Sequence, residues 1–272
     1  MSFDPLFAVD GKVVIVTGGM GQLGRSFALA LRERGARVAV LDVNVDDAQV
    51  EERFGANREG LLFIAADVTI SPSLQSALAA IQSRWGIPHA LINNAAIDAP
   101  PDAPPEENGP FETYPESSWD RVMAVNTKGV FLCSRTFGAA MARAGRGSIV
   151  NISSIYGMVS PDQRIYDYRR QSDQEQFFKP IAYSASKSAL LNMTRYLATY
   201  WAQKGVRVNT LTLAGVFNGQ DERFLSPYCA HVPLGRMARI DEYNAAVVFL
   251  TSDASSYMTG SNMIIDGGWT AW

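Results

Sequence analysis

Short runs of apolar, mostly β-branched residues alternate along the chain with longer segments whose apolar residues recur at helical spacing. Nearly continuous apolar runs between helices are typical of parallel strands that are covered on both faces. The pattern predicts seven strands, at residues 12–17, 37–41, 61–65, 89–92, 148–152, 206–211 and 263–265. Segment 23–34, which follows the first run, is expected to be the first helix.

Strands that alternate with helices predict the α/β class, here a doubly wound, parallel seven-stranded sheet of the Rossmann type. In such a sheet, ligands bind beyond the carboxyl ends of the strands. No repeat or linker divides the 272 residues, so we expect a single domain over 1–272. Segments 99–116 and 160–179 interrupt the alternation. Because long connections are usually functional or mobile, we expect both to be inserts on the substrate side.

The composition narrows the classes of partner. Hydrophobic residues make up 47% of the chain and charged residues 19%, which suits a large buried core. A net charge of −3 without a basic block argues against nucleic acid and against an anionic membrane surface. Two cysteines without metal-ligand spacing favour a reducing compartment and no metal. The start has no signal pattern, and no apolar run reaches the roughly 20 residues of a membrane span. We therefore expect a soluble, cytoplasmic protein that binds a small-molecule substrate.

A glycine-rich string, TGGMGQLG at 17–24, lies between the first strand and the first helix. Glycines permit a tight turn and close approach of a ligand, and the helix N-terminus offers free N–H groups to a pyrophosphate. The candidate phosphate contacts are Gly18, Gly21, Gln22, Leu23 and Gly24. The alternative is a tight turn that binds nothing.

An acidic residue, Asp42, ends the second strand 18 residues after Gly24. A carboxylate there accepts hydrogen bonds from the ribose hydroxyls of NAD and repels the 2′-phosphate of NADP. No arginine stands at 41–43, so we predict NAD as the cofactor. Asp67, after the third strand, is a candidate adenine contact. Either aspartate could instead cap a turn.

A tyrosine and a lysine, Tyr183 and Lys187, open an apolar-periodic helix that runs to about residue 201. Their spacing of four puts both side chains on one face. An ammonium beside a phenol favours the phenolate, so we expect the pKa of Tyr183 to fall below its usual value of about 10. Such a tyrosine can serve as general acid or base. The alternative is an ordinary surface pair.

Further polar residues stand where strands end or helices continue. Ser153 and Ser154 follow the strand at 148–152, so their hydroxyls can meet a substrate oxygen. Asn126 lies within a helical pattern, where its side chain competes with the backbone hydrogen bonds. Such a local conflict is typical of a functional site.

These motifs together resemble the short-chain dehydrogenase/reductase family, in its compact single-domain branch. The matching segments are TGGMGQLG at 17–24, NNAA at 93–96, MAVNTKG at 123–129, NISSIYG at 151–157, YSASK at 183–187, PLGRMARIDEY at 233–243 and MTGSNMIIDGG at 258–268. The resemblance implies that Tyr183 exchanges the proton and that Lys187 holds the nicotinamide ribose and lowers the Tyr183 pKa. It also implies that Ser154, rather than Ser153, orients the substrate oxygen and that Asn126 anchors a water that relays protons.

The resemblance implies cofactor contacts along most of the chain. Beyond the glycine string and Asp42, they are Asp67, Val68, Asn94, Ala95, Tyr183, Lys187, Gly215 and Val216. Three departures bear on them: Gln22 stands where the family usually has glycine, NNAA replaces NNAG, and Ala214 replaces the proline before Gly215. The family also implies a homotetramer or homodimer, packed through the helices near 117–142 and 183–202.

The largest departure is the insert at 160–179, which separates Ser154 from Tyr183 by 29 residues. It carries Arg164, Arg169 and Arg170, with Tyr166 and Tyr168 between them. Guanidinium groups suit phosphates or carboxylates, and aromatic rings suit sugar or base faces. We therefore hypothesise a phosphorylated or nucleotide-linked sugar as substrate. The alternative is a solvated loop whose acidic residues neutralise the arginines. The insert also weakly resembles that of oxidoreductases of flagellin or surface-glycan modification.

Three functions remain to be separated. The first is an NAD(H)-dependent oxidoreductase that interconverts a secondary alcohol and a ketone. The second is a sugar-nucleotide epimerase or dehydratase that retains NAD, although the chain lacks the extra substrate domain usual in such enzymes. The third is a non-catalytic NAD sensor, which would need only the glycine string. Replacement of Tyr183 by Phe should abolish turnover in an enzyme and change nothing in a sensor.

Overall fold

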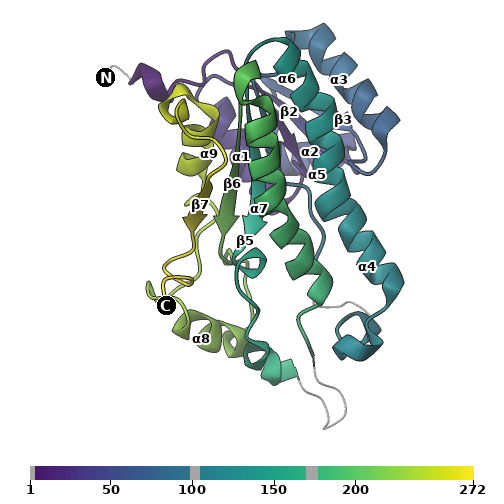
Figure 1. Ribbon diagram of the computed structural model, residues 1–272, viewed down its shortest axis with the longest axis vertical. Coiled ribbons are helices and arrows are strands. Elements are labelled where there is room, and N and C mark those ends of the chain that lie inside the picture. Colours follow the sequence, from purple (N-terminus) through teal and green to yellow (C-terminus); the bar gives the residue numbers. More distant parts are fainter. Residues whose placement is uncertain (1–3, 99–104, 170–176) are drawn as a thin grey trace.

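The strands of the protein lie side by side in one parallel sheet with helices on both faces (Figure 1). The computed structural model describes residues 4–98, 105–169 and 177–272. Within these ranges the sheet has seven strands in the order β3-β2-β1-β4-β5-β6-β7. They are β1 Val13–Thr17, β2 Arg37–Asp42, β3 Leu61–Ala65, β4 Ala90–Asn93, β5 Gly147–Ser154, β6 Val206–Leu213 and β7 Asn262–Ile265. The predicted fold class is confirmed, and β5 extends beyond its predicted end to include Ser154.

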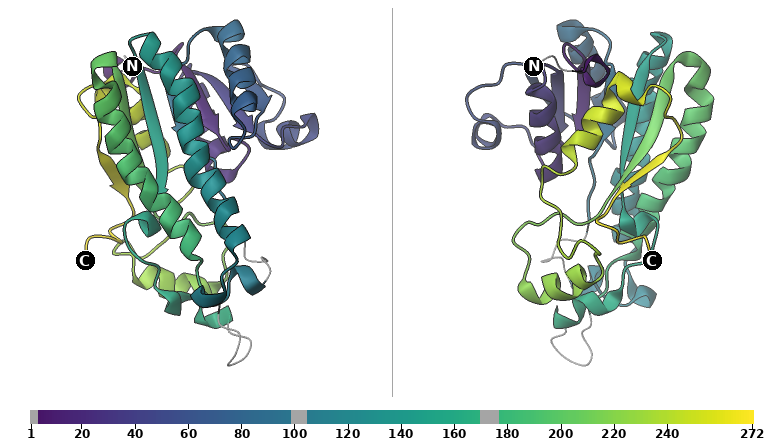
Figure 2. Two further views of the ribbon diagram at one scale, coloured as in Figure 1. Left: turned by 45° about the vertical axis from the view of Figure 1, so that its right-hand side comes forward. Right: turned by 90° about the vertical axis from the view of Figure 1, so that its left-hand side faces the viewer.

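Helices cover the sheet in two layers (Figure 2). They are α1 Gln22–Arg32, α2 Asp47–Phe54, α3 Ser71–Trp85, α4 Glu116–Met123, α5 Val130–Cys133, α6 Ala139–Arg143, α7 Ile181–Trp201, α8 Glu222–Ala230 and α9 Asn244–Thr251. Side chains alternate along a strand, so Val14 packs with α1 and α9 while Val13 packs with α3, α6 and α7. Because both faces are covered, every residue of β1 is buried, which explains the continuous apolar run. Across the described ranges, no helix is long and apolar enough to cross a membrane.

The order of the strands creates a switch point between β1 and β4. The chain moves outward from β1 to β3 and then returns to place β4 on the other side of β1. Connections from the carboxyl ends of β1 and β4 therefore diverge, which leaves a crevice for a ligand. Thr17, Asp42, Asn93 and Ser154 all end their strands at this edge.

The insert at 160–179 is partly folded into the protein. A 3-10 helix at Gln163–Arg169 lies with α8 beyond the carboxyl ends of the strands (Figure 1). Tyr166 is buried there, with its ring centroid 5.8 Å from that of Phe224 on α8. The expectation that Tyr166 offers an exposed ring to a sugar is therefore wrong, because the ring completes a small aromatic core. Of the other insert, 99–116, residues 99–104 lie outside the described residues.

The long helix α7 has one buried and one exposed face. Trp201 packs in the core, whereas Tyr196 and Tyr200 are exposed and stack with ring centroids 6.0 Å apart. Assembly through this helix stays a prediction.

A chain of buried polar side chains ties the middle of the sheet to α7. Asn151 on β5 accepts a hydrogen bond from Asn93 Nδ2 on β4 at 2.8 Å. Its own Nδ2 donates to Thr194 Oγ1 on α7, also at 2.8 Å. Thr210 on β6 donates to the same Thr194 hydroxyl at 2.7 Å. All four side chains are buried, so each depends on these partners for its hydrogen bonds.

Replacement of Asn151 should therefore destabilise the protein. Asn151→Ala removes the acceptor of one Asn93 N–H and one of the two donors to the Thr194 hydroxyl in the interior, and we expect the free energy of unfolding to fall by about 2–4 kcal/mol. Denaturant titration measures this. The matched control is Thr199→Ala, because the exposed Thr199 hydroxyl bonds only to carbonyls of its own helix. Equal stability of the two variants would contradict a structural role for the buried chain.

Candidate active site

The glycine string forms a turn that packs closely against the segment after β4. Gly18 has φ +61°, and a Cβ there would stand 2.7 Å from the Cα of Ala95. A Cβ on Gly24 would stand 2.2 Å from the carbonyl oxygen of Gly18. The Asn94 side-chain amide donates to the carbonyls of Thr17 and Gly18, at 3.0 and 3.1 Å. Asn94 and Ala95 thus hold the turn itself, and only glycine fits at positions 18 and 24.

The N-terminus of α1 fits a pyrophosphate. Its N-cap is Gly21, no side chain bonds the first amides, and the first turn carries no acidic residue. Gly21 and Gln22 are exposed, while Leu23 is partly buried against the core. Free amides and the helix dipole together favour an anion at this position. The Gln22 Nε2 donates to the carbonyl of Phe217 at 3.4 Å. The turn therefore accommodates glutamine at a position where glycine is usual.

The carboxylate of Asp42 lies beside the same turn. It accepts hydrogen bonds from the amides of Met20, at 3.0 Å, and Val43, at 2.8 Å. Arg53 on α2 donates to the Met20 carbonyl, which brings a guanidinium to the same turn. Arg53 was not among the predicted site residues, because it is 11 positions from Asp42 in the chain. Its only signal in the sequence is that it is a basic residue in the last turn of α2.

The remaining predicted cofactor contacts have partners within the protein. Asp67 accepts from the amide and hydroxyl of Thr69, at 2.8 and 2.7 Å. It therefore caps a turn, which was the alternative to an adenine contact. Val68 is buried, and its side chain packs closely against Gly129. After β6, the Gly215 amide donates to the Tyr228 hydroxyl at 2.7 Å. The neighbouring Val216 carbonyl accepts from Gln220 at 2.9 Å.

Ser154, Tyr183 and Lys187 come together where β5 meets the start of α7. The Ser154 hydroxyl lies close enough to the Tyr183 phenol to lower its pKa. Ser153 points elsewhere and donates to the Lys187 carbonyl at 3.0 Å. The Lys187 Nζ donates to the Ile152 carbonyl at 2.8 Å and lies 5.8 Å from the centroid of the Tyr183 ring. The structure therefore places the predicted serine, and not its neighbour, beside the tyrosine.

Burial controls the protonation of this group. It raises the pKa of Tyr183 above its usual value, and the negative charge of Asp98 raises it further, while the Ser154 hydroxyl opposes the shift. Burial lowers the pKa of Lys187 to about 8. The prediction of a lowered Tyr183 pKa is wrong for this structure. Both groups lie in the same desolvated site, where each neutral form is favoured and the amine loses its charge more easily.

Asn126 is completely buried within a π-helical turn, Ala124–Gly129. Its Oδ1 accepts from the Ile97 amide at 2.8 Å, and its Nδ2 donates to the Ile97 carbonyl at 2.9 Å. The same Nδ2 donates to Ser186 Oγ at 3.0 Å, and that hydroxyl donates to the Tyr183 carbonyl at 2.7 Å. Asn126 therefore positions the segment after β4 and the helix that carries Tyr183. Its water-relay role stays a prediction.

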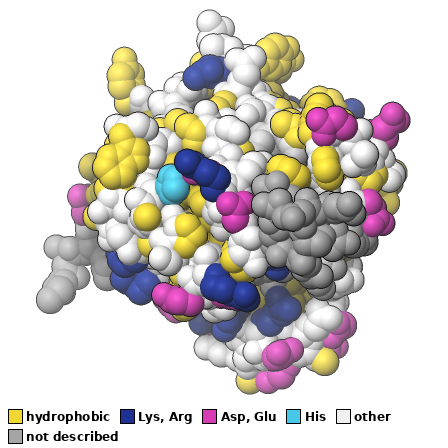
Figure 3. All heavy atoms as spheres, turned by 90° about the horizontal axis from the view of Figure 1, so that it is seen from below, with side chains coloured by type: hydrophobic (Ala, Val, Ile, Leu, Met, Phe, Trp, Pro, Cys, Tyr) yellow, Lys and Arg dark blue, Asp and Glu magenta, His cyan; other side chains and the backbone are white. Residues whose placement is uncertain are grey.

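The arginines of the insert are engaged within the protein or lie outside the described residues. Arg164 bonds the Asp162 carboxylate, with Nη2 at 2.7 Å, and its side chain is 81% exposed. The guanidinium of Arg169 lies over the rings of Phe177 and Tyr168, 4.9 and 5.8 Å from their centroids. Arg170 lies outside the described residues. Seen from the carboxyl ends of the strands, acidic and basic side chains are interspersed (Figure 3). Among the described residues, no His, Cys, Asp and Glu cluster could hold a metal.

Comparisons with known proteins agree on one family. A family model described as "Enoyl-(Acyl carrier protein) reductase" matches residues 19–270. The chain is 33% identical to the D-threitol dehydrogenase of Mycolicibacterium smegmatis, over 99% of this chain and 97% of the relative. It is 32% identical to the galactitol 2-dehydrogenase of Rhizobium johnstonii, over 100% of both. A short-chain dehydrogenase from Leptospira borgpetersenii, solved with bound NAD+, has 32% identity and a TM-score of 0.83, with 99% of this chain and 97% of that chain covered.

The protein therefore belongs to the short-chain dehydrogenase/reductase family. Its fold, its order of motifs and its named relatives make it an oxidoreductase that acts on CH–OH groups.

The pH dependence of turnover follows from the protonation of the site. Alcohol oxidation needs a proton acceptor, and the Lys187 amine, with a pKa of about 8, loses its proton before the Tyr183 phenol. Because deprotonation of this coupled pair supplies the base, we expect kcat/KM for oxidation to rise with pH through about 8. The reverse reduction should slow over the same range. Profiles that stay flat from about pH 6 to about pH 9 would rule out this pair as the proton-exchanging group.

Proposed function

We propose that the protein is an NAD(H)-dependent polyol dehydrogenase that oxidises a secondary hydroxyl of a neutral sugar alcohol to a ketone. The observation that carries the proposal is the meeting of Ser154 and Tyr183, with Lys187 behind them, at the edge of the sheet that carries the glycine turn. The names of the relatives support the substrate class, since D-threitol and galactitol are both neutral polyols.

Each side chain has a defined part in the proposed reaction. When bound, NAD would supply the acceptor for the hydride. Ser154 donates a hydrogen bond to the reacting oxygen and fixes its position. In oxidation Tyr183 Oη takes the hydroxyl proton and gives up its own phenolic proton, which the neutral Lys187 amine accepts; in reduction both transfers are reversed. The glycine turn and the first amides of α1 would hold the pyrophosphate.

A phosphorylated or nucleotide-linked sugar is the second candidate substrate. Arg169 supports it, because its guanidinium lies on the substrate side over two aromatic rings. Arg164 does not support it, because its guanidinium already forms an ion pair with Asp162. The cytoplasm is the proposed compartment, and both cysteines are free, in keeping with a reducing environment.

A turnover screen tests the proposal. D-threitol, glycerol and galactitol are offered with NAD, each beside a phosphorylated counterpart, and NADH absorbance is followed. We expect faster turnover of the neutral members and a loss of about 10²–10⁴-fold in kcat in Tyr183→Phe, with NAD binding retained. Preference for the phosphorylated members, lost in Arg169→Ala, would favour the second candidate. Product without released NADH would indicate an epimerase, and an unchanged Tyr183→Phe would indicate a sensor.

The choice of NAD over NADP rests on Asp42. In Asp42→Ala the acceptor for the ribose hydroxyls and the charge that repels a 2′-phosphate are both lost, and Arg53 remains nearby as a cation. We expect the ratio of kcat/KM for NAD to that for NADP to fall by about 10- to 100-fold. Adding Arg53→Ala should remove the gain in NADP use. Glu52→Gln is the control, because this exposed carboxylate lies on the same helix. A ratio that stays constant in Asp42→Ala would refute the role of Asp42.

A further inference from the structure

The last residue of the insert, Lys179, lies directly over the catalytic tyrosine. Its Nζ is 5.0 Å from the centroid of the Tyr183 ring and forms an ion pair with Asp98, which belongs to the segment after β4. The Lys179 side chain is only 11% exposed, and that of Asp98 is 36% exposed. The Asp98 carboxylate and the Lys179 ammonium therefore lie side by side near the Tyr183 phenol. A short polyol bound at the phenol is long enough to contact both of them.

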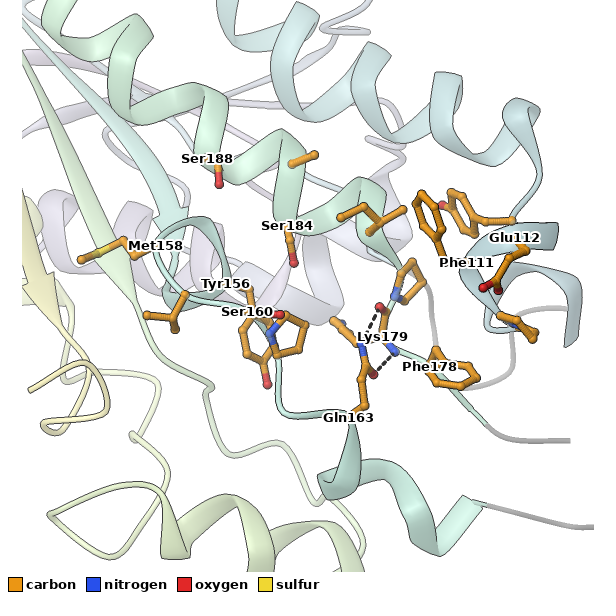
Figure 4. Close-up of a pocket in the computed structure, with 18 residues that line it drawn as sticks. Phe111, Glu112, Tyr156, Met158, Ser160, Gln163, Phe178, Lys179, Ser184 and Ser188 are labelled. Atoms are coloured by element: carbon orange, nitrogen blue, oxygen red, sulfur yellow. Dashed lines mark hydrogen bonds between the residues drawn. The ribbon is translucent and has the colours of Figure 1, made fainter. Parts of the chain in front are cut away.

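The backbone of Lys179 is fixed by the substrate-side segments around it. The side-chain amide of Gln163 accepts from the Lys179 amide at 2.8 Å and donates to its carbonyl at 3.3 Å (Figure 4). One residue earlier, the Phe178 amide donates to the Asn108 carbonyl at 2.8 Å. Asn108 lies in the 99–116 insert and Gln163 in the 160–179 insert, so both inserts converge on this position.

The backbone next to Asp98 is fixed equally well. Its neighbour Ile97 makes two hydrogen bonds with the buried Asn126 amide, which also anchors α7 through Ser186. Exposed ion pairs contribute little to stability, because two long side chains must be ordered in water. Here the ordering is supplied by the surrounding backbone. The pair is therefore preorganised in the way that a binding group requires.

We propose that Asp98 and Lys179 determine substrate specificity by binding a hydroxyl next to the carbon that is oxidised. The Asp98 carboxylate accepts a hydrogen bond from that hydroxyl, and the Lys179 ammonium donates one to its oxygen. Because the two charges cancel, the pair suits a neutral diol better than a phosphate or a simple alcohol. The inference rests on the proposed function and adds the feature by which a polyol is distinguished from a monohydric alcohol.

Matched substrates test the pair. D-threitol and sec-butanol share a carbon skeleton but differ in the neighbouring hydroxyls, and a site that bonds a hydroxyl strongly disfavours an analogue that lacks it. We expect wild type to prefer D-threitol, or whichever polyol leads the screen above, by about 10²-fold or more in kcat/KM. Measured above the rise of each variant's pH profile, Asp98→Asn and Lys179→Met should raise KM for the polyol by about 10-fold or more and leave KM for sec-butanol unchanged. Most of the preference should thereby be lost.

A control and a second readout separate specificity from a structural effect. Asp253→Asn makes the same change in an ion pair with Lys12, at the amino end of β1, and should leave the preference intact. Asp98→Asn should also move the rise of the pH profile to lower pH, because the charge of Asp98 raises the pKa of both Tyr183 and Lys187. Thermal unfolding and NADH binding of each variant report whether the protein is folded.

The outcomes distinguish this inference from the proposed function. A wild type that turns over sec-butanol as well as any polyol, or that oxidises no polyol, overturns both. A wild type that prefers polyols, with Asp98→Asn and Lys179→Met keeping that preference, overturns only the role of the pair. Equal losses on both alcohols without a shift of the pH profile also overturn it, because the pair would then act only on structure.

Discussion

The buried amide of Asn126 is the interaction on which the site depends. It bonds both backbone groups of Ile97 and the hydroxyl of Ser186. Three segments far apart in the chain are thereby held together: the segment after β4, the π-helical turn and the beginning of α7. In an ordinary α-helical turn the Asn126 side chain would point in another direction. The π-helical turn, which is locally less favourable, is therefore what allows this contact. Since the amide uses its donors on the protein, any loss of one partner leaves buried polar groups unpaired.

Charge near the tyrosine is balanced by the same arrangement. Asp98 follows the anchored Ile97, and Lys179 reaches it from the insert. Arg164 of the insert is bound to Asp162. Acidic and basic side chains are interspersed over the face beyond the carboxyl ends of the strands (Figure 3). A balanced field neither attracts nor concentrates an anionic substrate. The described part of the insert therefore contributes hydrogen-bonding groups and a packed aromatic core beside the site.

Much of the fold and part of the site could be predicted from the sequence, because these features are local. The buried strands are continuous apolar runs, and the glycine turn, Asp42 and the Tyr183–Lys187 spacing are each contained in one short segment. The features that were missed depend on residues brought together by folding. Lys179 and Asp98 are 81 positions apart, and Arg53 lies on an exposed helix with no unusual pattern. The direction of the Tyr183 pKa shift and the burial of Tyr166 depend on desolvation, which only the packed structure determines.

The order of the strands affects how the protein can fold while it is being synthesised. β1 to β4 all lie within residues 13–93, and this part includes the glycine turn, Asp42 and the start of the segment that holds that turn. A ribosome releases this part before α7 is synthesised. One edge of β4 pairs with β1, and the other pairs with β5, which emerges only after the whole α4–α6 segment. During that interval an apolar strand edge has no partner and is open to association with other chains. Until β5 is synthesised, a chaperone or rapid completion of the chain is therefore needed to keep the part that includes the glycine turn from associating with other chains.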